Sequence, residues 1–386
     1  MNPTLVAEVA PAFVGRTRGR RHERPLAIRK EYNDGSQGGS MIKSWIFEFL
    51  HAPGGPSEDV APELATAVFD AGIAHWQQIE RLGFEGIFFS EHHFGPSYSP
   101  SPNLLIAAIA RSTERLRLGT MGMVLPLYQP WRVLEEIGML DHLTGGRLEI
   151  GCASGVPQEL IQIGIAAEEN RERFNEALDI LDAWLAQPVI SHRGRYWNFD
   201  NLRIVPRPVQ RPSPPRWTTV ISTASAAKSA GRGSKICTAF ESITRVGELF
   251  DAYRTAADRR GMPCEPEQLA IRRNVSIARS VGEAREASRM AMEETRKLLA
   301  GDPRAGTHSP SLLDAPKTGS GFSVHDDEFI AGTPAQVTEQ IIDQCRGCGA
   351  GHFVAILGRA VDRRRTEAVT LFGEKVIPIL RRAEIG

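Results

Sequence analysis

The chain has 386 residues, enough for one large barrel or two smaller domains, and its 41% hydrophobic content supports a full core. Its 46 basic and 46 acidic residues balance, which excludes a global attraction to nucleic acid or to an anionic membrane surface. No apolar run reaches the roughly 18 residues of a membrane-spanning helix, and five scattered cysteines are typical of reduced thiols in a cytoplasmic enzyme.

Residues 1–40 differ in composition from the rest of the chain. They are strongly basic between Gly15 and Lys30, polar and glycine-rich from Asp34 to Ser40, and they lack the apolar segment of a secretory signal. We expect a disordered N-terminal extension over residues 1–40; a basic arm for an anionic partner is the alternative. The folded part is then a single domain over residues 41–386.

From residue 43 onward, apolar strand patterns alternate with helical patterns. Eight alternations favour a (β/α)8 barrel of the TIM type, with a doubly wound open sheet as the alternative. Residues 188–215 look irregular, and the stretch 301–328, rich in Gly, Pro and Ser, is a candidate lid or a disordered insertion. The expected strands cover residues 43–50, 87–90, 116–126, 147–155, 217–222, 236–240, 270–278 and 352–357.

The second expected strand ends abruptly in titratable residues. Ile87 to Ser90 is apolar or small, Glu91, His92 and His93 follow, and then Gly95 enforces a loop. Barrel enzymes carry their chemistry at the carboxyl ends of the strands, so this is the candidate active site. Adjacent histidines on a strand end point to opposite sides, and therefore we predict no metal site here.

Cys345 and Cys348 match the C-x-x-C pattern of redox and zinc sites. The pair lies where a helix ends, beside Gly347 and Gly349, and the sequence shows no second pair. We expect two thiols at a helix C-terminus without redox or metal chemistry.

The segment Phe89 to Phe94 resembles the Glu-His-His-Phe segment of bacterial luciferase-like flavin monooxygenases. The resemblance extends over about residues 41–383, and its order and spacing are close to those of the luciferase α subunit. The further matching segments are Leu118-Gly119-Thr120, Val124-Leu125-Pro126, Leu140-Asp141, Gly146-Arg147, the helix around Arg171, Pro215 to Gly233, Gly332-Thr333-Pro334 and Val376-Ile377-Pro378.

The resemblance implies a barrel that binds reduced FMN supplied by a separate flavin reductase. Oxygen adds to the flavin as a C4a-(hydro)peroxide, which oxidises a small organic substrate. Some relatives use the deazaflavin F420 for hydride transfer, and a non-catalytic barrel subunit is a third alternative that the retained Glu91-His92-His93 argues against. The family implies a homodimer, and the absence of a dinucleotide-binding glycine fingerprint fits a flavin reduced elsewhere.

The family also implies roles for single residues. His92 matches the histidine assigned general acid–base work, while Glu91 orients a neighbour or closes a polar network. Met121-Gly122 matches a cis peptide beside the flavin ring; a β-bulge is the alternative. Three further residues align with family contacts to the FMN phosphate: Ser222 and Ser225, whose alternative is helix capping, and Arg171, whose alternative is an exposed helix arginine. Ala153-Ser154 departs from the family, which has a reactive cysteine followed by an arginine here; Ser154 is expected to donate a hydrogen bond to the phosphate instead.

Overall fold

The computed structural model describes residues 40–51, 60–95, 97–262, 264–300, 324–358 and 363–385. Of the extension expected for residues 1–40 and the candidate lid or insertion expected for 301–328, residues 1–39 and 301–323 lie outside these ranges. Ser40 and Met41 form the short strand β1 (Ser40–Met41), which pairs antiparallel with β14 (Glu384–Ile385) at the other end of the chain. The domain boundary at residue 41 stays a prediction.

Eight parallel strands form a closed ring, which confirms the predicted (β/α)8 barrel. The ring closes in two places: β10 pairs with β11 through Cys237 and Ala270, and the last ring strand pairs with the first through Ala355 and Ile46. In ring order the strands are β2 (Lys43–Glu48), β3 (Gly86–Phe89), β4 (Arg117–Thr120), β6 (Leu148–Ala153), β9 (Arg216–Val220), β10 (Lys235–Thr238), β11 (Leu269–Ile277) and β13 (His352–Ile356).

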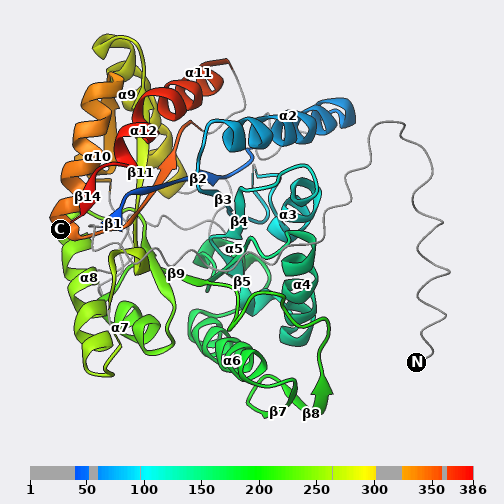
Figure 1. The fold of residues 1–386 in the computed structure, drawn as a ribbon. Helices are drawn as coiled ribbons and strands as arrows, with labels where there is room; N and C mark the ends of the chain where they lie inside the picture. The colour runs from blue at the N-terminus through cyan, green and yellow to red at the C-terminus, as the bar shows by residue number, and fades with distance from the viewer. Residues whose placement is uncertain are drawn as a thin grey trace, which may run out of the picture. The chain divides into compact units, whose positions relative to one another are not determined.

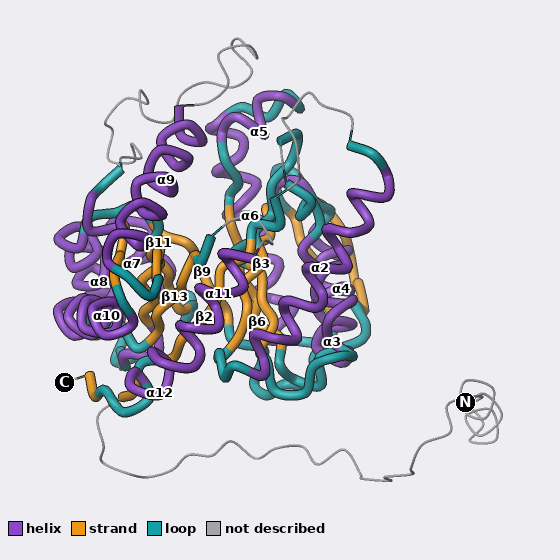
Figure 2. The backbone as a smooth tube through the Cα atoms, turned by 90° about the horizontal axis from the view of Figure 1, so that it is seen from above, coloured by secondary structure: helices purple, strands orange, loops and turns teal. Residues whose placement is uncertain are grey.

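Helices surround this ring in chain order (Figure 1), and they lie outside the strands in the perpendicular view (Figure 2). None of the described helices is long and apolar enough to cross a membrane. The covering helices are α2 (Pro62–Arg81), α3 (Pro102–Ala110), α4 (Pro130–Leu143), α6 (Ala167–Ala186), α7 (Thr223–Gly231), α8 (Ile243–Asp258), α9 (Val281–Ala300), α10 (Pro334–Cys348), α11 (Arg363–Leu371) and α12 (Ile377–Leu380).

The structure corrects the sequence interpretation in two connections. Residues 188–215, expected to be irregular, contain an antiparallel hairpin of β7 (Val189–Arg193) and β8 (Asn198–Arg203). The expected strand 116–126 is divided into β4, β5 (Met123–Val124) and the short helix η2 (Leu125–Leu127). The hairpin strands are mostly exposed, so they lack the apolar alternation by which half-buried strands are found.

The remaining short elements connect the strands and helices or extend the sheet. Helix α5 (Pro157–Gln162) follows β6 and lies beyond one end of the strands in Figure 2. The short helix η5 (Asp326–Glu328) leads into β12 (Phe329–Gly332), which pairs with the second half of β11. The segment before α12 is η6 (Phe372–Val376), and η3 (Pro266–Gln268) precedes β11.

Alternating side chains along each strand fill the inside of the ring. On β2, Ile46 belongs to the core under the helices, whereas Trp45 and Phe47 belong to the inner core. The Trp45 and Phe88 rings stack with their centroids 4.5 Å apart. The Trp45 indole donates a hydrogen bond of 2.8 Å to His352 Nδ1, so the amino end of the ring is closed by packed aromatic and polar groups. A site can therefore open only at the carboxyl end.

Candidate active site

His92 lies at the carboxyl end of β3 and turns its ring toward the inside of the barrel. Phe88 lies four residues before His92 on the same face of the chain, and its side chain belongs to the inner core. The imidazole stacks on Phe49 with centroids 5.7 Å apart and an interplanar angle of 17°. Its Nδ1 lies 2.9 Å from Oε1 of Glu159 in the first turn of α5. This carboxylate fixes the ring orientation and leaves Nε2 available for a proton at the barrel mouth.

Glu91 and His93 form a second, separate pair. Glu91 is buried; its Oε1 lies 3.0 Å from His93 Nε2, and its Oε2 accepts the Val124 backbone N–H at 3.2 Å. The hydrogen bond to Glu91 raises the pKa of His93, against the opposing effect of burial. Burial and the bond to Glu91 also raise the pKa of Tyr128. Glu91 thus closes a polar network, one of the two roles expected for it.

The two histidines therefore use different carboxylates, as expected for neighbours on one strand. His92 pairs with Glu159 and His93 pairs with Glu91. Of the two, only His92 stacks on the inner-core ring of Phe49, while His93 contacts the neighbouring Phe94.

The Met121–Gly122 peptide bond is cis, which confirms that expectation. The Met121 side chain belongs to the inner core. A Cβ on Gly122 would lie 2.7 Å from the Cys152 carbonyl carbon and 2.8 Å from its nitrogen, so the close approach of β6 requires glycine here. Contact with a flavin ring stays a prediction for both residues.

Ser222 and Ser225 are brought together at the start of α7. Ser222 is the N-cap; its hydroxyl accepts the Ser225 N–H at 3.2 Å, and the Ser225 hydroxyl accepts the Ser222 N–H at 3.3 Å. This reciprocal cap is the structural role that competes with phosphate binding. The first turn holds no acidic residue, and Thr223 and Ala224 are exposed. The helix end therefore offers N–H groups and a favourable dipole to an anion.

Ser154 and Arg171 are less closely tied to this helix end. Ser154 is half-buried just after β6, the ring neighbour of β9 that leads into α7. Arg171 is exposed in the first turns of α6. Since α6 returns from the carboxyl end of β6 to the amino end of β9, its first turns lie at the carboxyl face of the barrel. Both residues thus share that face with Ser222, and their phosphate contacts stay predictions.

The residues present fit a flavin. A phosphate would lie at the start of α7 with Ser222 and Ser225 as hydroxyl partners. The ring would lie over Met121–Gly122 at the barrel mouth. The Ser90 hydroxyl, two residues before His92 on the same strand face, is buried without a hydrogen-bond partner among the described residues, and it is a ready donor for a polar ring edge.

The sequence interpretation missed three groups of this site. Glu159 pairs with His92 across 67 residues of chain, and Phe49 supplies the stacking surface. Arg272 lies inside the barrel, with its guanidinium carbon 5.1 Å from the centre of the Phe47 ring. Of these three groups, Arg272 alone could have been recognised from the sequence, because a charged residue at an inward position of a buried strand is unusual.

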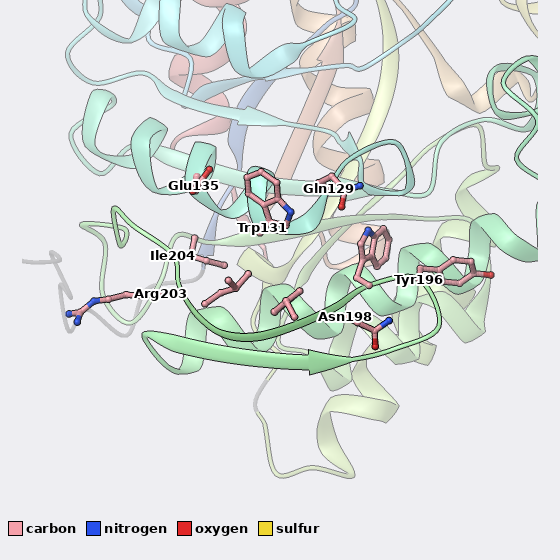
Figure 3. A pocket seen from close by; sticks show the side chains of 10 residues that line it. Gln129, Trp131, Glu135, Tyr196, Asn198, Arg203 and Ile204 are labelled. Carbon is pink, nitrogen blue, oxygen red and sulfur yellow. The ribbon is translucent and has the colours of Figure 1, made fainter.

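A separate cavity of about 540 Å³ lies outside the ring, between the start of α4 and the β7–β8 hairpin (Figure 3). It contains none of the residues predicted for the site. Its lining is Gln129, Trp131, Glu135, Tyr196, Trp197, Asn198, Phe199, Leu202, Arg203 and Ile204.

Cys345 and Cys348 lie at the C-terminus of α10, as expected, and both are buried free thiols. Burial raises the pKa of Cys348 to about 11 and that of Cys345 well above its ordinary value. A buried neutral thiol is a poor nucleophile, and the expected lack of redox or metal chemistry at this pair stays a prediction.

A family model described as luciferase-like monooxygenase matches residues 46–351. Protein y4wF of Sinorhizobium fredii, itself uncharacterized, is 33% identical over 285 residues, which cover 71% of this chain and 80% of its own length. The oxygenase component of flavin-dependent trigonelline monooxygenase from Acinetobacter baylyi is 33% identical over 155 residues, 39% of this chain and 42% of that protein.

Solved structures share the fold at lower identity. Monooxygenase RslO1 from Streptomyces bottropensis superposes with a TM-score of 0.74 at 24% identity, covering 88% of this chain and 99% of its own. The oxygenating constituent of 3,6-diketocamphane monooxygenase from Pseudomonas putida, in complex with FMN, superposes with a TM-score of 0.70 at 21% identity. The superposition covers 88% of this chain and 98% of that one. The F420-dependent tetrahydromethanopterin reductase from Methanopyrus kandleri superposes with a TM-score of 0.66 at 16% identity. The superposition covers 89% of this chain and 99% of that one.

The family model spans most of the barrel, from β2 to the residue before β13, and includes the Glu91-His92-His93 segment. The chain therefore belongs to the family of luciferase-like monooxygenases.

Proposed function

We propose that the protein is the oxygenase component of a two-component system, using reduced FMN and O2 to oxidise a small organic substrate. Reduced FMN would supply the electrons that activate O2, and a separate flavin reductase would deliver it. The observation that carries the proposal is His92: an imidazole at the barrel mouth, held by Glu159 at 2.9 Å and stacked on Phe49. The FMN complex of the 3,6-diketocamphane enzyme and the flavin-dependent trigonelline enzyme support it.

The chain's own residues have distinct tasks in this proposal. His92 holds or donates a proton at Nε2, since Glu159 occupies Nδ1. The aromatic wall of Phe47 and Phe49 excludes water from the same face, and Ser222 with Ser225 binds the phosphate. Glu91 acts as a positioning residue, because its carboxylate holds His93 and the Val124 backbone beside the cis peptide. We also propose a homodimer, as the family resemblance implies.

The proposal is tested by mixing the anaerobic complex of the protein and reduced FMN rapidly with oxygenated buffer. We expect a transient absorbing species, distinct from oxidised FMN and longer-lived than in free solution. His92→Ala should shorten the lifetime of this species roughly 10- to 100-fold. This factor corresponds to the loss of one hydrogen bond to a charged group, which is worth about 1.5–3 kcal/mol.

The matched control is His192→Gln, since His192 also pairs with a glutamate, Glu176, at 3.1 Å, but lies on the peripheral hairpin. It should leave the lifetime unchanged. Oxidation of bound FMN at the free-solution rate in the unmodified protein would overturn the monooxygenase proposal. An unchanged lifetime in His92→Ala would overturn the role of His92 alone.

Hydride transfer with F420 or a flavin is the second candidate, favoured by the shared fold of the F420-dependent reductase at a TM-score of 0.66. In that case the reduced cofactor should stay stable in air when bound. Substrate should then be converted without oxygen. A protein that binds neither cofactor in either redox state would instead act as a non-catalytic subunit.

A further inference from the structure

A buried arginine faces the inside of the barrel, and three of its five guanidinium N–H groups have no hydrogen-bond partner among the described residues. Arg272 is 5% exposed, and Ala270, two residues earlier on β11, belongs to the inner core. The guanidinium carbon lies 5.1 Å from the Phe47 ring centre and 4.4 Å from that of Phe240. Among the described residues, Nε and Nη2 have no hydrogen-bond partner. A buried charge in this state needs an anion.

These two nitrogens form one edge of the guanidinium. Nε–H and one N–H of Nη2 run parallel, which is the geometry that binds both oxygens of a carboxylate at once. The two aromatic contacts place ring centres 5.1 and 4.4 Å from the guanidinium carbon and bring no hydrogen-bond acceptor oxygen to this edge. The unused groups therefore match a planar anion with two adjacent acceptor atoms.

Among the described residues, the carboxylate that forms an ion pair with Arg272 is that of Glu328, and it accepts its hydrogen bonds from other side chains. Glu328 Oε2 accepts a bond of 3.3 Å from Arg273, and Oε1 accepts one of 3.4 Å from Asn274. Arg272 Nη2 lies 3.9 Å from Glu328 Oε1, which is an ion-pair distance but not a hydrogen bond. Two guanidinium groups thus share one carboxylate, and an excess positive charge remains beside the inner core.

An unbroken aromatic path joins Arg272 to His92. Phe47, under the guanidinium, has its ring centroid 4.9 Å from that of Phe49, and Phe49 stacks on His92 at 5.7 Å. The residues proposed for the flavin lie on or beside β4, β6 and β9, consecutive strands of the ring, whereas Arg272 lies on β11, across the ring from β4. Arg272 thus faces Met121 and Gly122 from the opposite wall, and it lies two strands from β9, which leads to the proposed phosphate residues.

We propose that Arg272 is a specificity-determining residue that binds a carboxylate of the organic substrate, so that the protein oxidises anionic rather than neutral molecules. The carboxylate lies on the unused edge formed by Nε and Nη2, and the rest of the substrate lies along Phe47 and Phe49 toward His92. This assignment rests on the proposed function, because the flavin residues define the wall that the substrate faces.

The test is calorimetric titration of the FMN-loaded and the flavin-free protein with acetate and propionate, and with the isosteric acetamide and propionamide. We expect the carboxylates to bind roughly 10- to 100-fold more tightly than the amides, as expected for charge-assisted hydrogen bonds. Arg272→Gln should abolish this preference. Arg272→Lys should keep only part of it, since lysine has the charge without the planar edge. FMN affinity should not change in either variant.

The matched control is Arg289→Gln, which removes the same charge from an exposed position on α9 and should keep the preference. Equal affinities for carboxylate and amide in the unmodified protein, including no binding of either, overturn the proposal. A preference that persists in Arg272→Gln overturns it as well. If Arg272→Gln weakens binding of reduced FMN and leaves the preference intact, the cation serves the flavin instead. Failure to bind FMN refutes the proposed function alone, because the flavin-free titration still reports on Arg272.

Discussion

His92 and His93 are adjacent in sequence but reach different environments because successive residues of a strand face opposite ways. His92 points into the barrel beside Phe49, and His93 is held by the buried Glu91. Another buried charged pair lies at the end of the neighbouring strand β2. Glu48, at the end of β2, accepts two bonds from Arg365 at 3.2 and 2.9 Å and one of 2.8 Å from the Trp76 indole.

Arg365→Met should lower the free energy of unfolding by about 3–5 kcal/mol, because it leaves the Glu48 carboxylate buried without its cation. Both side chains are 1% exposed, so water cannot compensate. The double variant with Glu48→Gln should recover part of this loss. Urea denaturation of the two single variants and the double variant measures the coupling. Additive losses would show that the two residues act independently.

The same pair predicts a pH dependence. Burial by itself raises the pKa of Glu48, but the charge and hydrogen bonds of Arg365, together with the hydrogen bonds from Trp76 and the Leu50 backbone, lower the pKa below 4.5. A lowered folded-state pKa contributes stability that is present above the unfolded value and is lost as pH falls through the folded value. The stability difference between the unmodified protein and Glu48→Gln should therefore shrink as pH falls below 4.5.

At the level of strands and helices, close backbone approach decides where glycine is required. Thr120 on β4 donates its hydroxyl to the Gly151 carbonyl on β6 at 2.7 Å. A Cβ on Gly151 would lie 1.8 Å from the Thr120 carbonyl oxygen. At Gly247, within α8, no atom of the described residues lies within 4 Å of the corresponding position, apart from its chain neighbours and the backbone of its own helix. The two glycines are therefore present for different reasons.

Gly151→Ala should destabilise the protein by about 3 kcal/mol or more, since the clash is with backbone that belongs to the sheet. Gly247→Ala should stabilise it by roughly 0.5–1 kcal/mol, the helix preference of alanine over glycine. Thermal unfolding of both variants measures the contrast. A Gly151→Ala protein as stable as the parent would mean that β4 and β6 separate without cost.

The ring as a whole depends on strands from both ends of the chain. β2 lies between β3 and β13, and β13 also pairs with β11. Removing β13 would leave two neighbouring strands with unpaired edges in the middle of an apolar core. Unpaired edges of this kind promote aggregation.

A fragment that ends at residue 300 should therefore fail to fold, whereas a chain that begins at Ser40 keeps every ring strand and should fold. Circular dichroism and size-exclusion chromatography of both fragments test this. A single cooperative unfolding transition in the shorter fragment would show that seven strands suffice. The control is the fragment starting at Ser40, which should unfold at the same temperature as the full chain.

The sequence by itself determined the barrel class, because eight apolar segments alternate with helical ones and the periodicity of each is local. It also placed titratable residues at the end of β3, and it located the end of α10 at Cys345 and Cys348. Local patterns of turn, cap and periodicity are sufficient for such assignments.

Only the tertiary structure decided which side chains meet. Glu159 reaches His92 from 67 residues away, and Glu48 reaches Arg365 across 317. The alternation on β11 places Arg272 inside the barrel, but only the closed ring places Phe47 under its guanidinium. The physical reason is that ring closure sets these distances, and no local pattern encodes the position of a strand's distant neighbours. The exposed β7–β8 hairpin could not be predicted from the sequence for a related reason. Contacts with Glu176 on α6, rather than an apolar pattern of its own, hold the turn of this hairpin.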